Sequence, residues 1–273
     1  MPPRVRARRT RATRPALVSL VGALASVALT VTATAAPVGS DAMPYFSDGS
    51  AAQPFASGPP PTKQSLVTSN AGTVVGVASF VGSGDAGDYP AYSGAADGPR
   101  AVVAMVNTSA TDAMTPLAKG FFFGADVKTD TVSTGSSYDN GNNVFQRGLY
   151  SDRAQYKIQI DHGYAMCRVK GDLGNIALTS KFLMPASQWF RVRCFRKVLS
   201  TGDQLWLEVT PINGDGTLGA VVRSKSGIKR VGRLTFLPET PVSIGGKLIS
   251  ATQIHGASDQ FNGLIDNPIL DIN

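Results

Sequence analysis

The chain has 273 residues, of which 42% are hydrophobic, and its mean hydropathy is near zero. These values are typical of a globular protein and exclude wholesale disorder. The formal charge of +7 is concentrated at one end, because six of the 26 basic residues are arginines within the first 15 positions. The remainder has 20 basic and 19 acidic residues, too even a balance for a surface that neutralises the phosphates of a nucleic acid.

The N-terminus has the pattern of an export signal. The arginine-rich start is followed by an apolar run from Ala16 to about Thr32, and then by Ala-Thr-Ala at 33–35, which has small residues where a signal peptidase needs them. We expect a signal peptide over residues 1–35. An uncleaved anchor is the alternative, because about 20 apolar residues can span a bilayer. No later segment is predicted to cross a membrane, so the product should have no membrane contact after cleavage.

A linker is predicted after the signal. From 36 to 61, 18 of 26 residues are Ala, Pro, Gly or Ser, a composition too poor in large apolar side chains to offset the entropy of ordering. We therefore expect a flexible linker at 36–63 and a folded domain at 64–273. No segment of that domain sustains helical spacing, and apolar residues recur with period two or in short runs.

Three segments show strand alternation most clearly. Apolar and polar residues alternate in Ala154–Asp161, Ala165–Lys170 and Phe190–Cys194, and the first of these reads as a strand with one wet face. Further strands are predicted at Thr73–Val81, Arg100–Val106, Gly120–Val127, Asn143–Tyr150, Asn175–Phe182, Gln204–Pro211, Leu218–Ser224, Val242–Lys247 and Gly263–Ile272. About a dozen short strands at hairpin spacing predict an all-β sandwich or jelly roll.

Cys167 and Cys194 are the only cysteines in the chain. An even number of cysteines in an exported chain indicates a disulfide. Both fall on the inward-facing set of their strands, which is consistent with pairing between neighbouring strands of one sandwich. The alternative is two unpaired thiols in the core.

Three stretches carry a resemblance to a known family: Asn143–Lys170, Trp189–Cys194 and Asp259–Asn267. Together they resemble laminin-G-like, concanavalin A-like jelly-roll domains of exported bacterial proteins, and the F-x-G-x-I-D pattern of Phe261–Asp266 is the most typical piece. The resemblance covers roughly residues 100–273. It implies a two-sheet antiparallel jelly-roll sandwich that binds a carbohydrate or protein ligand on its concave face or rim, frequently with a calcium ion.

Relatives with this architecture include glycoside hydrolases, which need two carboxyl groups flanking the scissile bond. The only two glutamates, Glu208 and Glu239, lie in separate segments. Asp126 and Asp130 share a strand face, but Asp130 is expected in the following turn. Neither histidine belongs to a metal-binding or catalytic motif. We therefore predict no enzymatic activity, with a polysaccharide-active enzyme of unusual acid arrangement as the alternative.

Calcium is the one cofactor that the sequence favours, since a hard cation takes Asp, Asn and carbonyl oxygens. The candidate ligands are Asp139 and Asn140 in a turn, and Asp259 and Asp266 near the C-terminus, the last at the position that the family pattern fills with Asp. The alternative is that these residues only form turns and cap strands.

Two tyrosines near predicted turns, Tyr138 and Tyr150, are candidates to stack on a sugar ring. Trp189 and Trp206 are expected to pack in or across a sheet. A basic loop is a candidate to meet an acidic polymer, with a solvated loop as the alternative: Lys225, Lys229, Arg230 and Arg233.

These observations predict a secreted, extracellular, non-catalytic binding module whose partner is a glycan or a cell-surface protein. A glycoside hydrolase on the same fold and a purely structural or adhesion domain are the alternatives.

Overall fold

The structure is a computed structural model that describes residues 62–80, 85–91, 95, 97–108, 110–133 and 140–272. The predicted signal peptide, nearly all of the predicted linker, Tyr138 and Asp139 lie outside these ranges. Within them the chain forms strands and turns, and no helix long and apolar enough to cross a membrane is found there.

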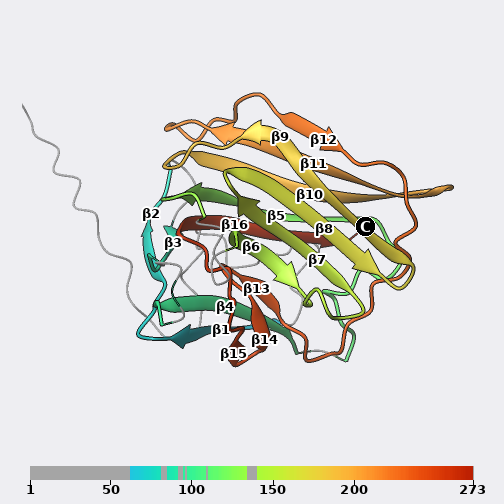
Figure 1. Cartoon of the computed structure of the whole chain (residues 1–273), viewed down its shortest axis with the longest axis horizontal. Coiled ribbons are helices and arrows are strands. Elements are labelled where there is room, and N and C mark those ends of the chain that lie inside the picture. Colours follow the sequence, from blue (N-terminus) through green and yellow to red (C-terminus); the bar gives the residue numbers. More distant parts are fainter. Residues whose placement is uncertain are drawn as a thin grey trace, which may run out of the picture. The chain divides into compact units, whose positions relative to one another are not determined.

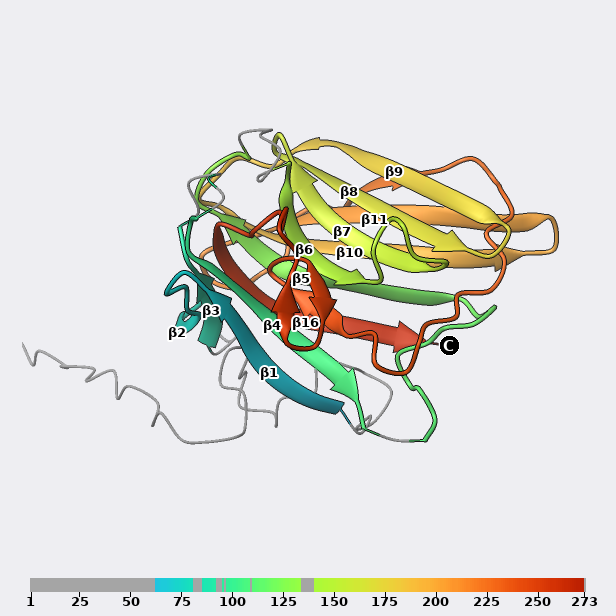
Figure 2. The same cartoon turned by 60° about the horizontal axis from the view of Figure 1, so that its bottom comes forward.

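Two antiparallel sheets form a sandwich (Figures 1 and 2). The first sheet has the strand order β1 (Thr62–Ser69), β4 (Arg100–Asn107), β13 (Val242–Ile244), β6 (Asn142–Arg147), β7 (Gln155–Asp161), β8 (Tyr164–Gly171), β9 (Gly174–Leu183). The second has the order β12 (Val222–Lys225), β11 (Gly202–Ile212), β10 (Trp189–Leu199), β5 (Phe121–Thr129), β16 (Gly263–Ile272), β3 (Asp85–Tyr89), β2 (Val75–Ala78). A separate hairpin joins β14 (Leu248–Ser250) and β15 (Gln253–Ile254). The predicted all-β, two-sheet antiparallel sandwich is confirmed.

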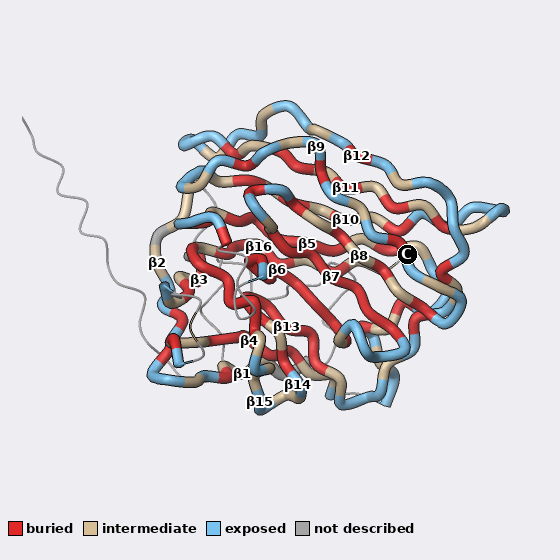
Figure 3. The backbone as a smooth tube through the Cα atoms, in the orientation of Figure 1, coloured by how far each residue is buried: buried red, intermediate tan, exposed pale blue. Residues whose placement is uncertain are grey.

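The core lies between the sheets and follows the predicted alternation. On β7 the inward side chains Tyr156, Ile158 and Ile160 are buried, and on β10 Phe190 and Val192 are buried opposite them in the second sheet. Figure 3 shows continuous buried backbone along β6 and β7, whereas buried and partly exposed residues alternate along β10 and β11. Alternation is the normal pattern for an antiparallel sheet with one solvated face, so β6 and β7 must be covered on both faces.

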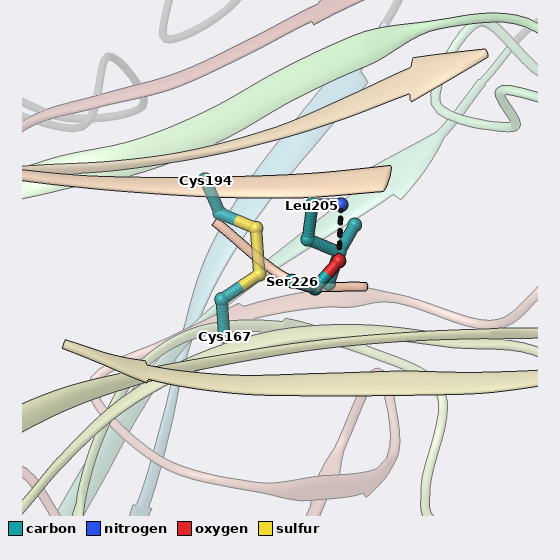
Figure 4. Close-up of a disulfide and its surroundings, with 4 residues drawn as sticks. All are labelled: Cys167, Cys194, Leu205 and Ser226. Carbon is teal, nitrogen blue, oxygen red and sulfur yellow. Dashed lines mark hydrogen bonds between the residues drawn. A yellow bond between two sulfur atoms is a disulfide. The ribbon is translucent and has the colours of Figure 1, made fainter. Parts of the chain in front are cut away.

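The predicted disulfide is confirmed. Cys167 on β8 and Cys194 on β10 are bonded and fully buried, with a Cα–Cα distance of 6.1 Å. Figure 4 shows that the bond crosses from one sheet to the other, so it joins opposing strands of the sandwich. For a sequence separation of 27, loop-closure entropy gives a stabilisation of roughly 3.5 kcal/mol.

A buried arginine of the first sheet points into the sandwich. Arg147 of β6 is fully buried, and its guanidinium nitrogens donate to Asp112 at 2.7 and 3.1 Å, to the Thr115 hydroxyl at 3.0 Å and to the Thr240 carbonyl at 3.1 Å. The guanidinium carbon also lies 4.5 Å from the centroid of the Phe236 ring. We call these five residues the Arg147 cluster. Each of the three guanidinium nitrogens has an acceptor, as a buried charge requires.

Candidate functional site

The outer face of β6, β7 and β8 forms the floor of a groove of about 440 Å³, within the range of small-ligand sites. We call it the polar groove. Its floor is made of side chains that point away from the core: Gln146, Gln155, Lys157, Gln159, Met166 and Arg168. Strand register sets Gln146, Lys157 and Arg168 side by side in one row across the three strands.

The walls of the polar groove come from distant parts of the chain. Tyr150 follows β6, Lys247 lies between β13 and β14, and His255 and Asp259 lie between β15 and β16. These walls bury side chains that the sequence places on a wet strand face: Gln155 is only 2% exposed and Lys157 only 7%. The alternation of β7 is as predicted, but its outer face is a covered floor and is not open to solvent.

Two amide groups on the floor have a fixed orientation. The side-chain nitrogens of Gln146 and Gln155 both donate to the Gly148 carbonyl, at 2.8 and 3.1 Å. Because a carbonyl only accepts, each amide must turn its NH₂ group toward Gly148. Both Oε1 atoms are buried and have no hydrogen-bond partner within the described structure. The groove therefore presents two oriented acceptors, suited to hydroxyl or amide donors of a ligand.

The charges of the groove are not balanced. Lys157 and Lys247 share one carboxylate oxygen of Asp259, the Lys157 contact being 3.5 Å long. The other carboxylate oxygen of Asp259 and Nε of Arg168 are buried without a hydrogen-bond partner within the described structure. Burial, with the nearby charge of Lys247, lowers the pKa of Lys157 to about 8 against the attraction of Asp259.

Tyr150 lies at the rim of the groove and is 65% exposed. Its ring centroid lies 4.9 Å from the Arg168 guanidinium carbon and 5.3 Å from the Lys170 ammonium, which also donates to the Tyr150 carbonyl at 2.7 Å. The predicted stacking residue is therefore part of the groove, and its role as a sugar platform stays a prediction.

A second pocket of about 720 Å³ adjoins the polar groove, with Gln146 and Leu149 lining both. Hydrophobic side chains of the β14 strand and of the 235–241 segment line it, among them the exposed Leu237 and Ile249. Two carboxylates, Asp152 and Glu239, also line this pocket. The sequence places these acids 87 positions apart and gives no sign that they share a site.

Two of the predicted calcium ligands, Asn140 and Asp259, line the polar groove, whereas Asp266 lies elsewhere, on β16. Asp259 lies in the polar groove against two lysine ammonium groups, an environment that does not fit a calcium ligand. Asp266 is buried on β16 and accepts from the Ser79 hydroxyl at 3.1 Å. Asn140 lines the groove, but its neighbour Asp139 lies outside the described residues. Within the described ranges no group of three or more His, Cys, Asp or Glu side chains is placed to hold a metal ion.

The aspartate considered for catalysis is held by arginines. Asp126 is fully buried on β5 and accepts from Arg191 at 2.8 and 2.9 Å. Arg193 lies 3.3 Å from the same carboxylate, and the Asn267 side chain donates to it at 3.1 Å. The hydrogen bond to Asp126 raises the pKa of Arg191. A carboxylate so neutralised is poorly placed to exchange protons with a substrate.

The outer face of the second sheet carries an aromatic and cationic group, of which the sequence indicated only Trp206 and Lys225. Phe122, Phe195 and Trp206 lie side by side on β5, β10 and β11. The Trp206 ring centroid is 4.5 Å from the Lys225 ammonium and 5.2 Å from that of Lys197. We call these five residues the Trp206 cluster. Trp206 therefore packs across the sheet, as expected, and Lys225 is the one member of the predicted basic loop that joins it.

No protein-family model matches the chain, and no curated protein matches it. Solved structures with a similar fold include the LG1-3 region of the laminin alpha2 chain, with 8% identity and a TM-score of 0.41 over 54% of this chain and 26% of that one. Another is the enzymatically active domain of bacteriophage CBA120 tailspike protein 2, with 12% identity and a TM-score of 0.44 over 74% of this chain and 27% of that one. A third is carbohydrate-binding module CBM66 from Bacillus subtilis, with 9% identity and a TM-score of 0.32 over 75% of this chain and 94% of that one.

Laminin LG domains and a carbohydrate-binding module are thus among the similar structures. The chain spans about a quarter of the length of the laminin and tailspike structures. Identities and scores this low do not transfer a ligand or an activity. The chemistry of the polar groove therefore decides which function we propose.

Proposed function

We propose that the chain is an exported, non-catalytic binding module that takes a carbohydrate in the polar groove. The observation that carries this proposal is the set of buried polar atoms on the groove floor and wall that have no hydrogen-bond partner among the described residues. Native proteins satisfy nearly all buried polar groups, so several unsatisfied atoms at one place point to a missing ligand or to bound water.

Sugars match this chemistry well. Their hydroxyl groups donate to amide oxygens and accept from guanidinium and ammonium groups, and the groove offers both kinds of partner. Tyr150 supplies an exposed ring at the rim, and the adjoining pocket adds apolar surface for a longer chain. Export is supported by the inter-sheet disulfide, which forms in oxidising compartments.

The test is a glycan array with the mature domain, repeated with Gln155→Leu. Removal of one oriented acceptor should weaken binding of a retained glycan by about 5- to 150-fold, the effect of 1 to 3 kcal/mol. Gln204→Leu is the matched control, because Gln204 lies on the opposite sheet and donates to the Ser226 carbonyl at 2.9 Å. An array that stays blank, while the domain captures protein from cell surfaces, would overturn carbohydrate binding in favour of an adhesion role.

A polysaccharide-active enzyme is the second candidate, favoured by the joint presence of Asp152 and Glu239 in the adjoining pocket. Two carboxyl groups are the minimum for glycoside hydrolysis. Incubation with microbial and plant polysaccharides tests it: release of sugar by the parent chain, lost in Glu239→Gln and kept in Glu208→Gln, would establish the enzyme. Glu208 is the control because it lies on the opposite sheet, paired with Arg223 at 2.6 Å.

A further inference from the structure

The polar groove has more positive than negative charge. Lys157, Arg168 and Lys247 face a single carboxylate, that of Asp259, among the residues that line it. Arg168 forms no ion pair with any residue in the described ranges. The chain as a whole is nearly neutral after its first 15 residues, so this excess belongs to the groove.

This excess of positive charge destabilises the fold because the charges are buried. The Lys157 side chain is 9% exposed and the Asp259 side chain 4%, so water contributes little to balancing their charges. Lys157 and Arg168 are direct partners on adjacent strands, and like charges at such positions repel. An isolated protein reduces this cost by releasing the Lys157 proton, which is consistent with the lowered pKa of that group. A bound anion would remove the cost without loss of the proton.

The neighbouring groups indicate what else the anion must carry. Gln146 stands next to Lys157 in the same row, and its Oε1, like that of Gln155, is an acceptor without a partner in the part of the chain that the structure describes. Acceptors cannot bind a bare anion. They fit hydroxyl groups on the same molecule, so a ligand that satisfies the whole floor has both negative charge and hydroxyls.

We infer that the polar groove recognises an acidic sugar, with the ligand's carboxylate between Lys157 and Arg168 and its hydroxyls on the Gln146 and Gln155 oxygens. This inference rests on the proposed carbohydrate-binding function and specifies its ligand class. Arg168 can donate from Nε and a terminal nitrogen to both oxygens of a carboxylate, a geometry that a lysine alone does not offer.

The test compares uronic-acid oligomers with their methyl esters and with neutral oligomers of the same length, by calorimetry on the mature domain. The acid should bind about 10- to 100-fold more tightly than its ester, the effect of a charge-assisted hydrogen bond. Lys157→Met and Arg168→Met should each reduce this preference to below about threefold. Lys225→Met, an exposed cation of the Trp206 cluster on the opposite sheet, should leave it unchanged.

Binding should also depend on pH with a defined sign. The charged groups that face Lys157 are Lys247, Asp259 and Arg168, and His255 is the remaining ionisable group of the wall apart from Tyr150. Since the ligand binds charged Lys157, affinity for the acid should fall above pH 8 by up to about tenfold per pH unit. The Lys157→Met variant should lose this dependence while remaining folded by circular dichroism.

Three outcomes would overturn the inference, and they separate it from the proposed function. If ester and neutral oligomers bind in the groove as tightly as the acid, carbohydrate binding stands and acid selectivity fails. If the acid preference responds to Lys225→Met and not to Lys157→Met, the anion binds the opposite sheet. If no acidic or neutral sugar binds, both proposals fail together.

Discussion

The Arg147 cluster and the polar groove lie on opposite faces of β6, and both contain buried polar and charged side chains, yet they differ in one respect. Arg147, on the core side of β6, has an acceptor for each guanidinium nitrogen. Gln146, on the opposite side of the same strand, keeps a buried oxygen that no described residue satisfies. The two sites therefore share burial and differ in how completely their polar groups are hydrogen-bonded.

The comparison is tested most severely by Asp112→Ala, which leaves Arg147 charged in the core without its carboxylate. Loss of one partner of a buried ion pair costs about 3 to 5 kcal/mol of unfolding free energy. For a domain of this size the melting temperature should fall by about 6 to 20 °C. Asp97→Ala, at an exposed turn position, is the control and should change little. An unchanged melting curve in Asp112→Ala would refute the structural role of the cluster.

The disulfide offers the next largest effect. The double variant Cys167→Ala, Cys194→Ala should lose roughly 2 to 5 kcal/mol of unfolding free energy, measured by denaturant titration. Cys167 precedes Arg168 on β8 but points into the core, so the folded double variant should still bind the glycan. Two alkylatable thiols in the folded parent chain would contradict the disulfide itself.

A variant in the groove should behave in the opposite way to the disulfide variant, losing glycan binding and keeping its stability. Lys157→Met removes a buried ammonium while Asp259 keeps its contact with Lys247. No carboxylate is left unpaired, so stability at pH 7 should stay equal or rise, whereas glycan binding should weaken. The measurement pairs thermal unfolding with calorimetry on the same sample. A loss of stability comparable to that of Asp112→Ala would mean that Lys157 is part of the fold and not of a site.

The last expected effect is on the pH dependence of stability. The pKa of Lys157 is about 8 in the folded chain and 10.5 as an ordinary lysine, so between these values the unfolded chain binds more protons. The unfolding free energy contributed by this group should therefore rise with pH from about 8 to 10.5. Denaturant titrations at pH 7.5, 9 and 10 should show this rise in the parent chain and a smaller one in Lys157→Met.

Local alternation was enough to predict much of the fold. The period-two patterns of β7, β8 and β10 identified their inward faces, and hence the pairing of Cys167 with Cys194. β1 was not predicted, because Thr62–Ser69 has few apolar residues and is held by its register with β4. The short strands β3, β14 and β15 were also missed.

The polar groove could not be predicted from local sequence patterns, for a physical reason. Lys157 and Gln155 alternate like residues of any solvated strand face, and only long-range packing covers them. Their walls come from Lys247 and Asp259, 90 and 102 positions further along the chain. Tyr150 and Asp259 were selected from turn and family patterns, and both do line the groove, but nothing local indicated that lysines would hold Asp259.

The most direct test of the central claim is a nuclear magnetic resonance titration of the mature domain with the tightest-binding sugar from the uronic-acid panel. If the groove atoms without partners are the binding groups, the side-chain amide signals of Gln146 and Gln155 should shift with ligand. The indole signal of Trp206 on the opposite sheet should stay in place. Saturable binding that moves the Trp206 signal and leaves both glutamine signals unchanged would contradict the claim.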